Sequence, residues 1–215
     1  MRLDQYREIL KRVDSKFRQI QSMHGRQMQC GKGCAMCCHG LFDISLADAV
    51  GVAEGFAALS PDIRAQVLAR AETVQDSIGL HLMHRDDPRT DEVADSFAEP
   101  PRCPMLGPSN ECLIYEHRPL ACRLEGLPMV DRRDGLFADW CELNFVEGVS
   151  QTARADLTLD YDAIAVSDEV AAAEVAAVAG VADPESVVFI PSVVVYFERF
   201  WNDVLSAIIR RRPRN

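Results

Sequence analysis

Four cysteines stand within nine residues of this chain, in the segment CGKGCAMCCHG at positions 30–40. Glycines lie between and after them, and the last two cysteines, Cys37 and Cys38, are adjacent. Side chains of consecutive residues diverge from the backbone, so an adjacent pair does not easily serve one small ion. The segment therefore predicts a multinuclear centre, two neighbouring centres, or one cysteine that turns away from the others.

The remaining four cysteines are spread along the chain as single residues. Thiolates bind soft and borderline metals strongly. Structural zinc sites usually draw on two close ligand pairs, whereas one ligand-rich loop combined with distant single cysteines is typical of an iron–sulfur cluster. The pattern favours a cluster, foremost [4Fe–4S], with zinc as the alternative. It makes candidate metal ligands of all eight cysteines: Cys30, Cys34, Cys37, Cys38, Cys103, Cys112, Cys122 and Cys141.

The first three cysteines share one glycine-containing loop and are expected to converge on one centre. Glycine suits such a loop because it adopts left-handed conformations and lets backbone N–H groups approach the sulfurs. Cys122 is the expected fourth ligand of this centre, because Pro119 shapes the turn that presents it. The expected set is therefore Cys30, Cys34, Cys37 and Cys122.

The other cysteines have less certain partners in the sequence. Cys38 is expected to join Cys103 and Cys112 in a second site, or to pack as a buried thiol. Cys141 follows Trp140 and stands far from the rest, so packing in the core is as good an interpretation as ligation. In either arrangement the two cysteine-bearing segments are expected to meet in space.

The length and composition describe a folded protein that does not need disulfides. The chain has 215 residues, of which 48% are hydrophobic, enough for a core. It shows no apolar leader and no uninterrupted apolar span, so it is expected to be cytoplasmic and not to enter a membrane. In a reducing cytosol, clustered cysteines indicate metal or redox chemistry. A net charge of −10 disfavours nucleic acid, and a protein partner stays unidentified.

The spacing of apolar residues predicts a mainly α fold: a single domain of helices that encloses two irregular cysteine-bearing loops. Residues 1–23 form an N-terminal helix, residues 24–148 the cysteine-cluster metal-binding region, and residues 149–215 a C-terminal helical region. Further helices are expected from Ser45 to about Leu59, from Pro61 to about His84, over residues 168–179 and over residues 193–210, and a loop is expected between the second of these and Cys103.

Two shorter features complete the predicted fold. Asp134-Gly135 indicates a hairpin turn. The valines around Val187 and Val193 fit either a helix or a strand, and periodicity does not decide between them.

The Cys-x3-Cys-x2-Cys spacing is also the one that radical S-adenosylmethionine enzymes use. Those enzymes need a barrel of alternating strands and helices, and this chain has neither the length nor that alternation. A radical enzyme is therefore not expected. The chain also lacks a nucleophile–base pair, a phosphate loop and a dinucleotide fingerprint, so binding is favoured over catalysis and no catalytic residue is assigned.

Taken together, CGKGCAMCC, the later CPML and ECLIYEHRPLACR resemble the YkgJ-type CxxCxxCC family, which is described as zinc- or iron-chelating. The first gap is three residues here, where the family pattern has two. The resemblance covers residues 30–141 and implies metal chelation. One relative in the wider group is a flagellin lysine methylase, so the resemblance also implies a cluster-dependent, methylase-like enzyme as an alternative. The matching positions are Cys30, Cys34, Cys37, Cys38, Cys103, Cys112, Tyr115, Arg118, Pro119, Cys122 and Arg123.

Two arginines lie close to Cys122 in the sequence. A [4Fe–4S] centre with four thiolates is anionic, so Arg118 and Arg123 are candidate cofactor-binding residues that offset its charge. The alternative is an ordinary ion pair with one of the many acidic side chains. Three functions follow: an iron–sulfur protein for redox, cluster-delivery or sensing roles, a zinc-stabilised interaction module, or a cluster-dependent enzyme.

Overall fold

A computed structural model describes residues 2–31, 33–127, 129–130, 137–138, 140–150, 154, 156–157 and 161–211. The fold is mainly α, as predicted. The longer helices are α1 (Arg2–His24), α2 (Leu46–Ala58), α3 (Pro61–Ile78), α7 (Tyr161–Ala179) and α9 (Asn202–Arg211). The shorter ones are α4 (Arg89–Asp95), α5 (Leu120–Leu124), α8 (Ile190–Val195), the π-helix η4 (Phe197–Trp201) and the 3-10 turns η1 (Gly25–Gln27), η2 (Met36–Cys38) and η3 (Tyr115–His117).

Helix α2 is largely buried by the elements around it. It begins at the expected Ser45, whose side chain caps the helix by accepting a hydrogen bond from the Asp48 backbone N–H at 3.1 Å. Its sequence, LADAVGVAEGFAA, is rich in small and apolar residues, and most of its side chains are buried. Small side chains let neighbouring elements approach closely, and α2 packs against α7, α8 and α9.

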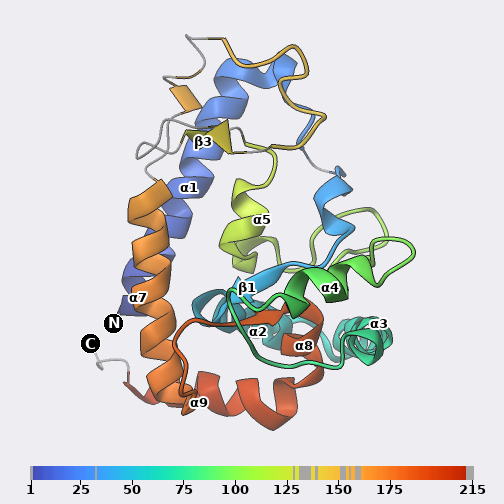
Figure 1. Ribbon diagram of the computed structural model, residues 1–215, viewed down its shortest axis with the longest axis vertical. Helices are drawn as coiled ribbons and strands as arrows, with labels where there is room; N and C mark the ends of the chain where they lie inside the picture. The colour runs from blue at the N-terminus through green and yellow to red at the C-terminus, as the bar shows by residue number, and fades with distance from the viewer. Residues whose placement is uncertain are drawn as a thin grey trace.

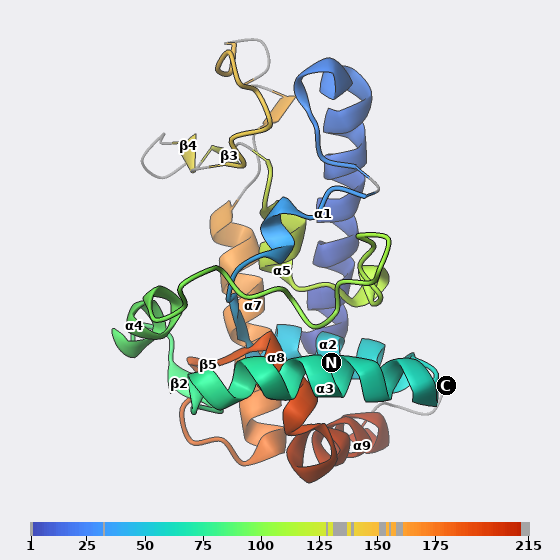
Figure 2. The ribbon, with the colours of Figure 1, turned by 90° about the vertical axis from the view of Figure 1, so that its right-hand side faces the viewer.

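Helices α1 and α7 pack side by side along the long axis of the molecule (Figure 1). Helix α1 buries an apolar stripe of Leu3, Tyr6, Val13 and Ile20, which confirms the predicted N-terminal helix. Helices α2, α3, α8 and α9 gather at one end, where α3 and α9 lie across the direction of α1 (Figure 2). Helix α5, which carries Cys122, packs against α1, beside the end where α2, α3, α8 and α9 gather.

A small antiparallel sheet adjoins α2 and has the order β1 (Asp43–Ser45), β5 (Ser186–Phe189), β2 (Met83–His84). In its register Ile44 faces Val188, and Met83 faces Val187. Val187 is therefore in a strand and Val193 in a helix. Val187 is in a strand because β5 pairs with β1 and β2, which are distant in sequence.

Several details of the predicted elements are wrong. The helix predicted over residues 168–179 begins earlier, at Tyr161. Helix α3 ends at Ile78 and not near His84, because Gly79 adopts a left-handed conformation (φ 67°) and the chain then turns into β2. The expected loop after it contains α4, whose first turn carries two acidic residues. The last predicted helix begins earlier, at Ile190 directly after Phe189, and is divided by the π-helix.

The hairpin prediction is confirmed in its strands. Strand β3 (Met129–Val130) pairs with β4 (Phe137–Ala138), whereas the turn at Asp134-Gly135 lies outside the described residues. None of the described helices is both long enough and apolar enough to cross a membrane.

Candidate metal centre

The two cysteine-bearing segments meet, as expected. The backbone N–H of Cys103 donates to the carbonyl of Cys38 at 2.8 Å, and the N–H of Gly40 donates to the carbonyl of Pro101 at 2.9 Å. Between these contacts His39 and Arg102 form an antiparallel bridge. Residues far apart in the sequence are thus joined by backbone hydrogen bonds.

The first segment is a run of tight turns. The N–H of Cys34 donates to the carbonyl of Gly31, and the N–H of Cys38 donates to that of Ala35. Gly33 lies in the left-handed region (φ 92°), which a side chain would disfavour. Turn η2 then carries Cys37 and Cys38 toward the second segment.

The second segment presents its cysteines from a folded loop and a short helix. The N–H of Leu106 donates to the carbonyl of Cys103 at 3.0 Å, and Leu106 forms a bridge with Cys112. Helix α5 begins after Pro119 and places Cys122 in its first turn. The carboxylate of Asp48 accepts a hydrogen bond from the first N–H of this helix, at Leu120, at 2.9 Å. Helix α2 therefore helps to position α5.

Four thiols lie together and are called the inner group: Cys37, Cys103, Cys112 and Cys122. Each of the six pairs within this group interacts electrostatically. Burial raises the pKa of Cys103 to about 11 and raises the pKa values of Cys112 and Cys122 as well. A hydrogen bond with Cys38 and then burial raise the pKa of Cys37. Unless a cation compensates their charge, these thiols stay protonated at neutral pH.

Three more thiols form an outer group: Cys30, Cys34 and Cys141. Cys30 interacts electrostatically with Cys141, Cys34 and Cys37, in decreasing order. Burial raises the pKa of Cys30, whereas a hydrogen bond from the side chain of Asn144, at 3.0 Å from its sulfur, acts in the opposite direction. The arrangement differs from the expected partnership, because Cys141 is beside Cys30 and Cys122 is with Cys103 and Cys112.

The two candidate arginines both pair with one acid. Arg118 donates to Asp14 of α1 at 2.8 Å, and Arg123 donates to the other oxygen of the same carboxylate. The guanidinium of Arg118 also lies over the ring of Tyr115, 4.0 Å from its centre. The ordinary ion pair is thus present. Both arginines nevertheless lower the pKa of Cys112, against the larger effect of burial.

Sequence reasoning missed several polar residues that hold this region in place. Asp14 orients both arginines, and Asn144 contacts Cys30. The side chain of Asp48 accepts hydrogen bonds from the Tyr6 hydroxyl and from the backbone N–H of Leu120, both at 2.9 Å. Burial raises the pKa of Asp48, and nearby Asp168 raises it further. No local pattern in the sequence indicates these roles, because each depends on a contact with a distant residue.

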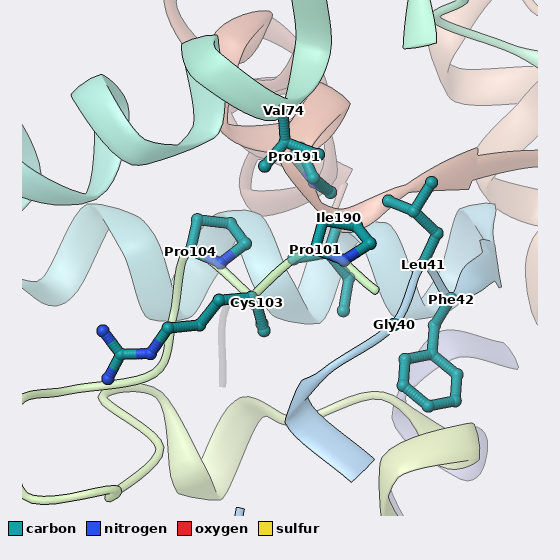
Figure 3. Close-up of a pocket in the computed structure, with 10 residues that line it drawn as sticks. Gly40, Leu41, Phe42, Val74, Pro101, Cys103, Pro104, Ile190 and Pro191 are labelled. Atoms are coloured by element: carbon teal, nitrogen blue, oxygen red, sulfur yellow. The ribbon is translucent and has the colours of Figure 1, made fainter. Parts of the chain in front are cut away.

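Two cavities adjoin the cysteine-bearing segments. Figure 3 shows the smaller one, about 10 Å³. Pro101, Cys103 and Pro104 lie on one side of it, and Val74 and Pro191 lie on the other. It is large enough for about one water molecule and belongs to the packing. A cleft of about 260 Å³ lies between α1, α2 and the segment that carries Arg118 and Arg123, and both arginines line it.

Within the described part of the chain, no three or more cysteine, histidine, aspartate or glutamate side chains are arranged to hold one metal ion as they stand. The donor chemistry fits iron or zinc, since the inner group offers four thiols and the outer group three. Two histidines near the cysteines have other contacts. His39 forms part of the backbone bridge to Arg102, and the ring of His117 lies 4.0 Å from the carboxylate of Glu54.

Comparison with known proteins gives a family. Neither the curated proteins nor the solved structures contain a match to the chain. Residues 29–142, more than half of the chain, match the family model CxxCxxCC, described as "Putative zinc- or iron-chelating domain". The match spans the inner and outer groups and the segments that carry them. The chain therefore belongs to the CxxCxxCC family of cysteine-rich, zinc- or iron-chelating domains.

Proposed function

We propose that the inner group binds an iron–sulfur cluster, [4Fe–4S], and that the protein serves in redox chemistry, cluster delivery or sensing. The observation that carries the proposal is the meeting of the two cysteine-bearing segments, where the backbone N–H of Cys103 donates to the carbonyl of Cys38 at 2.8 Å. There Cys37, Cys103, Cys112 and Cys122 are electrostatic neighbours of one another. Four thiolates from separate segments form a complete ligand set for such a cluster. As they stand, these thiols are not arranged to hold a metal. Binding therefore requires each side chain to rotate about its Cα–Cβ bond so that the four sulfurs face a common point.

The electrostatics of the inner group support a cationic iron core. Burial of the thiols disfavours their ionised forms, so a metal core that replaces their protons relieves a cost that the protein alone does not offset. A cluster with four thiolates is anionic overall, and Arg118 and Arg123 lie close enough to affect Cys112. Because both arginines are shared with Asp14, they offset only part of that charge.

The proposed place of action is the cytoplasm, because all eight cysteines are free thiols and a reducing compartment keeps them so. We expect no role in binding nucleic acid or membranes, since the chain carries a net charge of −10. The partner would be a protein that exchanges electrons or a cluster with this one. Zinc is the second candidate, since four cysteines also complete a tetrahedral zinc site that holds a protein-interaction module together.

Metal and sulfide analysis of protein purified without oxygen tests this proposal. We expect a brown protein with iron and acid-labile sulfide in equal amounts, and a charge-transfer absorption that fades on reduction. Replacing Cys112 by serine should remove iron and sulfide together, because it takes away one ligand of the set. A colourless protein that holds stoichiometric zinc and no sulfide would overturn the cluster and favour the interaction module.

A further inference from the structure

We infer that the cleft of about 260 Å³ beside α1 and α2 binds a small organic acid, with the carboxylate at Lys11 and Arg118 and the carbon chain against Leu10 and Ala47. The inference goes beyond the proposed cluster and stands without it, because no cysteine is among the described residues that line the cleft. Pockets for drug-sized ligands measure roughly 300–1,000 Å³. The smaller volume here fits a small metabolite.

One wall of the cleft is a single face of α1. Arg7, Lys11 and Asp14 lie four and three residues apart and all line the cleft, as side chains on one face of a helix do. Leu10 lines it as well and adds an apolar surface. The carboxylate of Asp14 accepts a hydrogen bond from Arg118 at 2.8 Å, which ties this wall to the segment that follows η3.

A second wall is a face of α2 with little side-chain volume. Ala47 and Gly51 line it, and a Cβ atom at Gly51 would have its nearest neighbour, the carbonyl oxygen of His117, at 3.5 Å. These small residues leave the cleft open. Glu54, on the next turn, binds Arg7 at 2.6 Å and lies 4.0 Å from the ring of His117, so it links this wall to α1 and to η3.

Six charged or titratable side chains close a ring around the cleft. We call them the charged ring: Arg7, Lys11, Asp14, Arg118, His117 and Glu54. Each member neighbours the next through helix spacing, adjacency in the chain or a contact given above. Three members carry a permanent positive charge and two a negative one, although the whole chain has a net charge of −10. This local excess of cationic groups favours an anionic ligand.

Lys11 and Arg118 keep hydrogen-bond donors for a ligand. The partner of Lys11 is Glu8, at 2.6 Å, and such exposed ion pairs are weak. Arg118 uses one of its nitrogens for Asp14, and its buried Nε has no acceptor among the described residues. The carboxylate of a ligand would accept charge-assisted hydrogen bonds from both residues.

The remaining acids of the cleft do not cancel this excess. Asp48 uses both carboxylate oxygens to accept hydrogen bonds from Tyr6 and Leu120, and burial raises its pKa, so its negative charge is reduced near neutral pH. Arg123, which also lines the cleft, acts on Asp48 as an opposite charge. Glu116 is exposed, so water and salt screen its charge.

Isothermal titration calorimetry of the full chain with butyrate tests the inference. We expect saturable binding of one butyrate per chain, and the affinity should fall as the salt concentration rises, because the main contact is ionic. Acetate has the same carboxylate but two fewer methylene groups to place against Leu10 and Ala47. It should therefore bind about tenfold more weakly.

Two substitutions in α1 form a matched pair, because each removes one positive charge. Lys11 lines the cleft, whereas Arg12 is exposed and lies outside the described lining. Lys11→Met should weaken butyrate binding about tenfold or more through the loss of a hydrogen bond to a charged group, and Arg12→Met should keep the affinity of the wild type. Gly51→Leu should abolish binding by filling the cleft. If it does not fold, Lys11→Met decides, since Lys11 is an exposed position.

Three results would overturn the inference. In the first, the wild type does not bind butyrate at millimolar concentrations. In the second, Lys11→Met and Arg12→Met bind it equally well, which means that only the net charge matters. In the third, butylamine binds in place of butyrate, which means that the carboxylates of the charged ring select a cation. Inorganic phosphate that binds as tightly as butyrate would overturn the assignment to an organic acid. A wild type without iron and sulfide would remove the proposed cluster and leave this test unchanged.

Discussion

At the scale of single residues, buried polar side chains position the thiols. Asp14 of α1 binds both arginines near Cys112, and Asp48 of α2 binds the first N–H of α5. Asn144 does the same for the outer group. Each of these contacts joins a cysteine-bearing segment to an element that is distant in the sequence. A change at one of them should therefore alter metal binding without removing a thiol.

Gly126 allows a matched test at this scale, because Gly148 has nearly the same backbone conformation, with φ 86° against 88°. Replacing either glycine by alanine introduces left-handed strain of about 1 kcal/mol. Only Gly126→Ala also places a Cβ atom 2.6 Å from the sulfur of Cys30, whereas a Cβ at Gly148 has no neighbour within 4 Å. We expect Gly126→Ala to lose a further 1–3 kcal/mol or so of stability, as overpacked sites do, and to bind less metal, because the sulfur of the candidate ligand Cys30 is displaced.

Urea unfolding and metal content of both variants check this expectation. Gly148→Ala should keep the metal content of the wild type, since it changes only the backbone. Equal losses of stability and metal in the two variants would mean that the space at Gly126 has no role beyond its conformation.

At the scale of elements, helices with a clear local signal were predictable and their ends were not. The apolar spacing of α1 and the Ser45 cap of α2 are properties of contiguous residues. In contrast, α3 ends before Gly79, whereas the local pattern extended the predicted helix through this glycine to about His84. Val187 is in a strand because β1 and β2 are there to pair with it. Such tertiary contacts override local propensity.

Two glycines in α2 test how closely this helix packs. A Cβ at Gly55 would lie 2.8 Å from the Cβ of Ile114 and 2.9 Å from that of His117, whereas at Gly51 its nearest neighbour is 3.5 Å away. Alanine favours a helix interior over glycine by about 0.5–1 kcal/mol. Gly51→Ala should therefore stabilise the protein by up to this amount, and Gly55→Ala should destabilise it by about 1–3 kcal/mol through overpacking. Thermal and urea unfolding measure both, and a stabilised Gly55→Ala variant would show that η3 moves away from α2 without cost.

At the scale of the whole molecule, the sequence showed which residues carry thiols but not which thiols lie together. The meeting of the two cysteine-bearing segments was expected and is confirmed by the contact between Cys38 and Cys103. The grouping of Cys141 with Cys30 was not expected, because it depends on Asn144, whose role no spacing in the sequence indicates. Chain spacing limits which ligands can be adjacent. The packing of α5 against α1 and its hydrogen bond to Asp48 of α2 then place Cys122.

Metal removal should loosen one part of the molecule and leave another folded. Among residues 29–43, no described side chain is buried, so this first cysteine-bearing segment has little apolar packing of its own. Helix α2 is held by side chains such as Val50 and Val52, both 0% exposed. If the proposed metals join the first segment to the rest, their loss removes most of what fixes it, because metal binding and local folding are coupled.

Hydrogen exchange of loaded and chelator-treated protein measures this difference. The amides of Cys34 and Cys38, which close the turns of the first segment, should exchange roughly tenfold faster or more after metal removal, which corresponds to about 1.4 kcal/mol of lost local stability. The amides of Val50 and Val52 should keep their protection, because buried apolar contacts and not the metals hold α2 in place. Loss of protection in α2 to the same extent would mean that the metals hold the whole fold together. Unchanged exchange at Cys34 and Cys38 would mean that backbone hydrogen bonds alone fix the first segment.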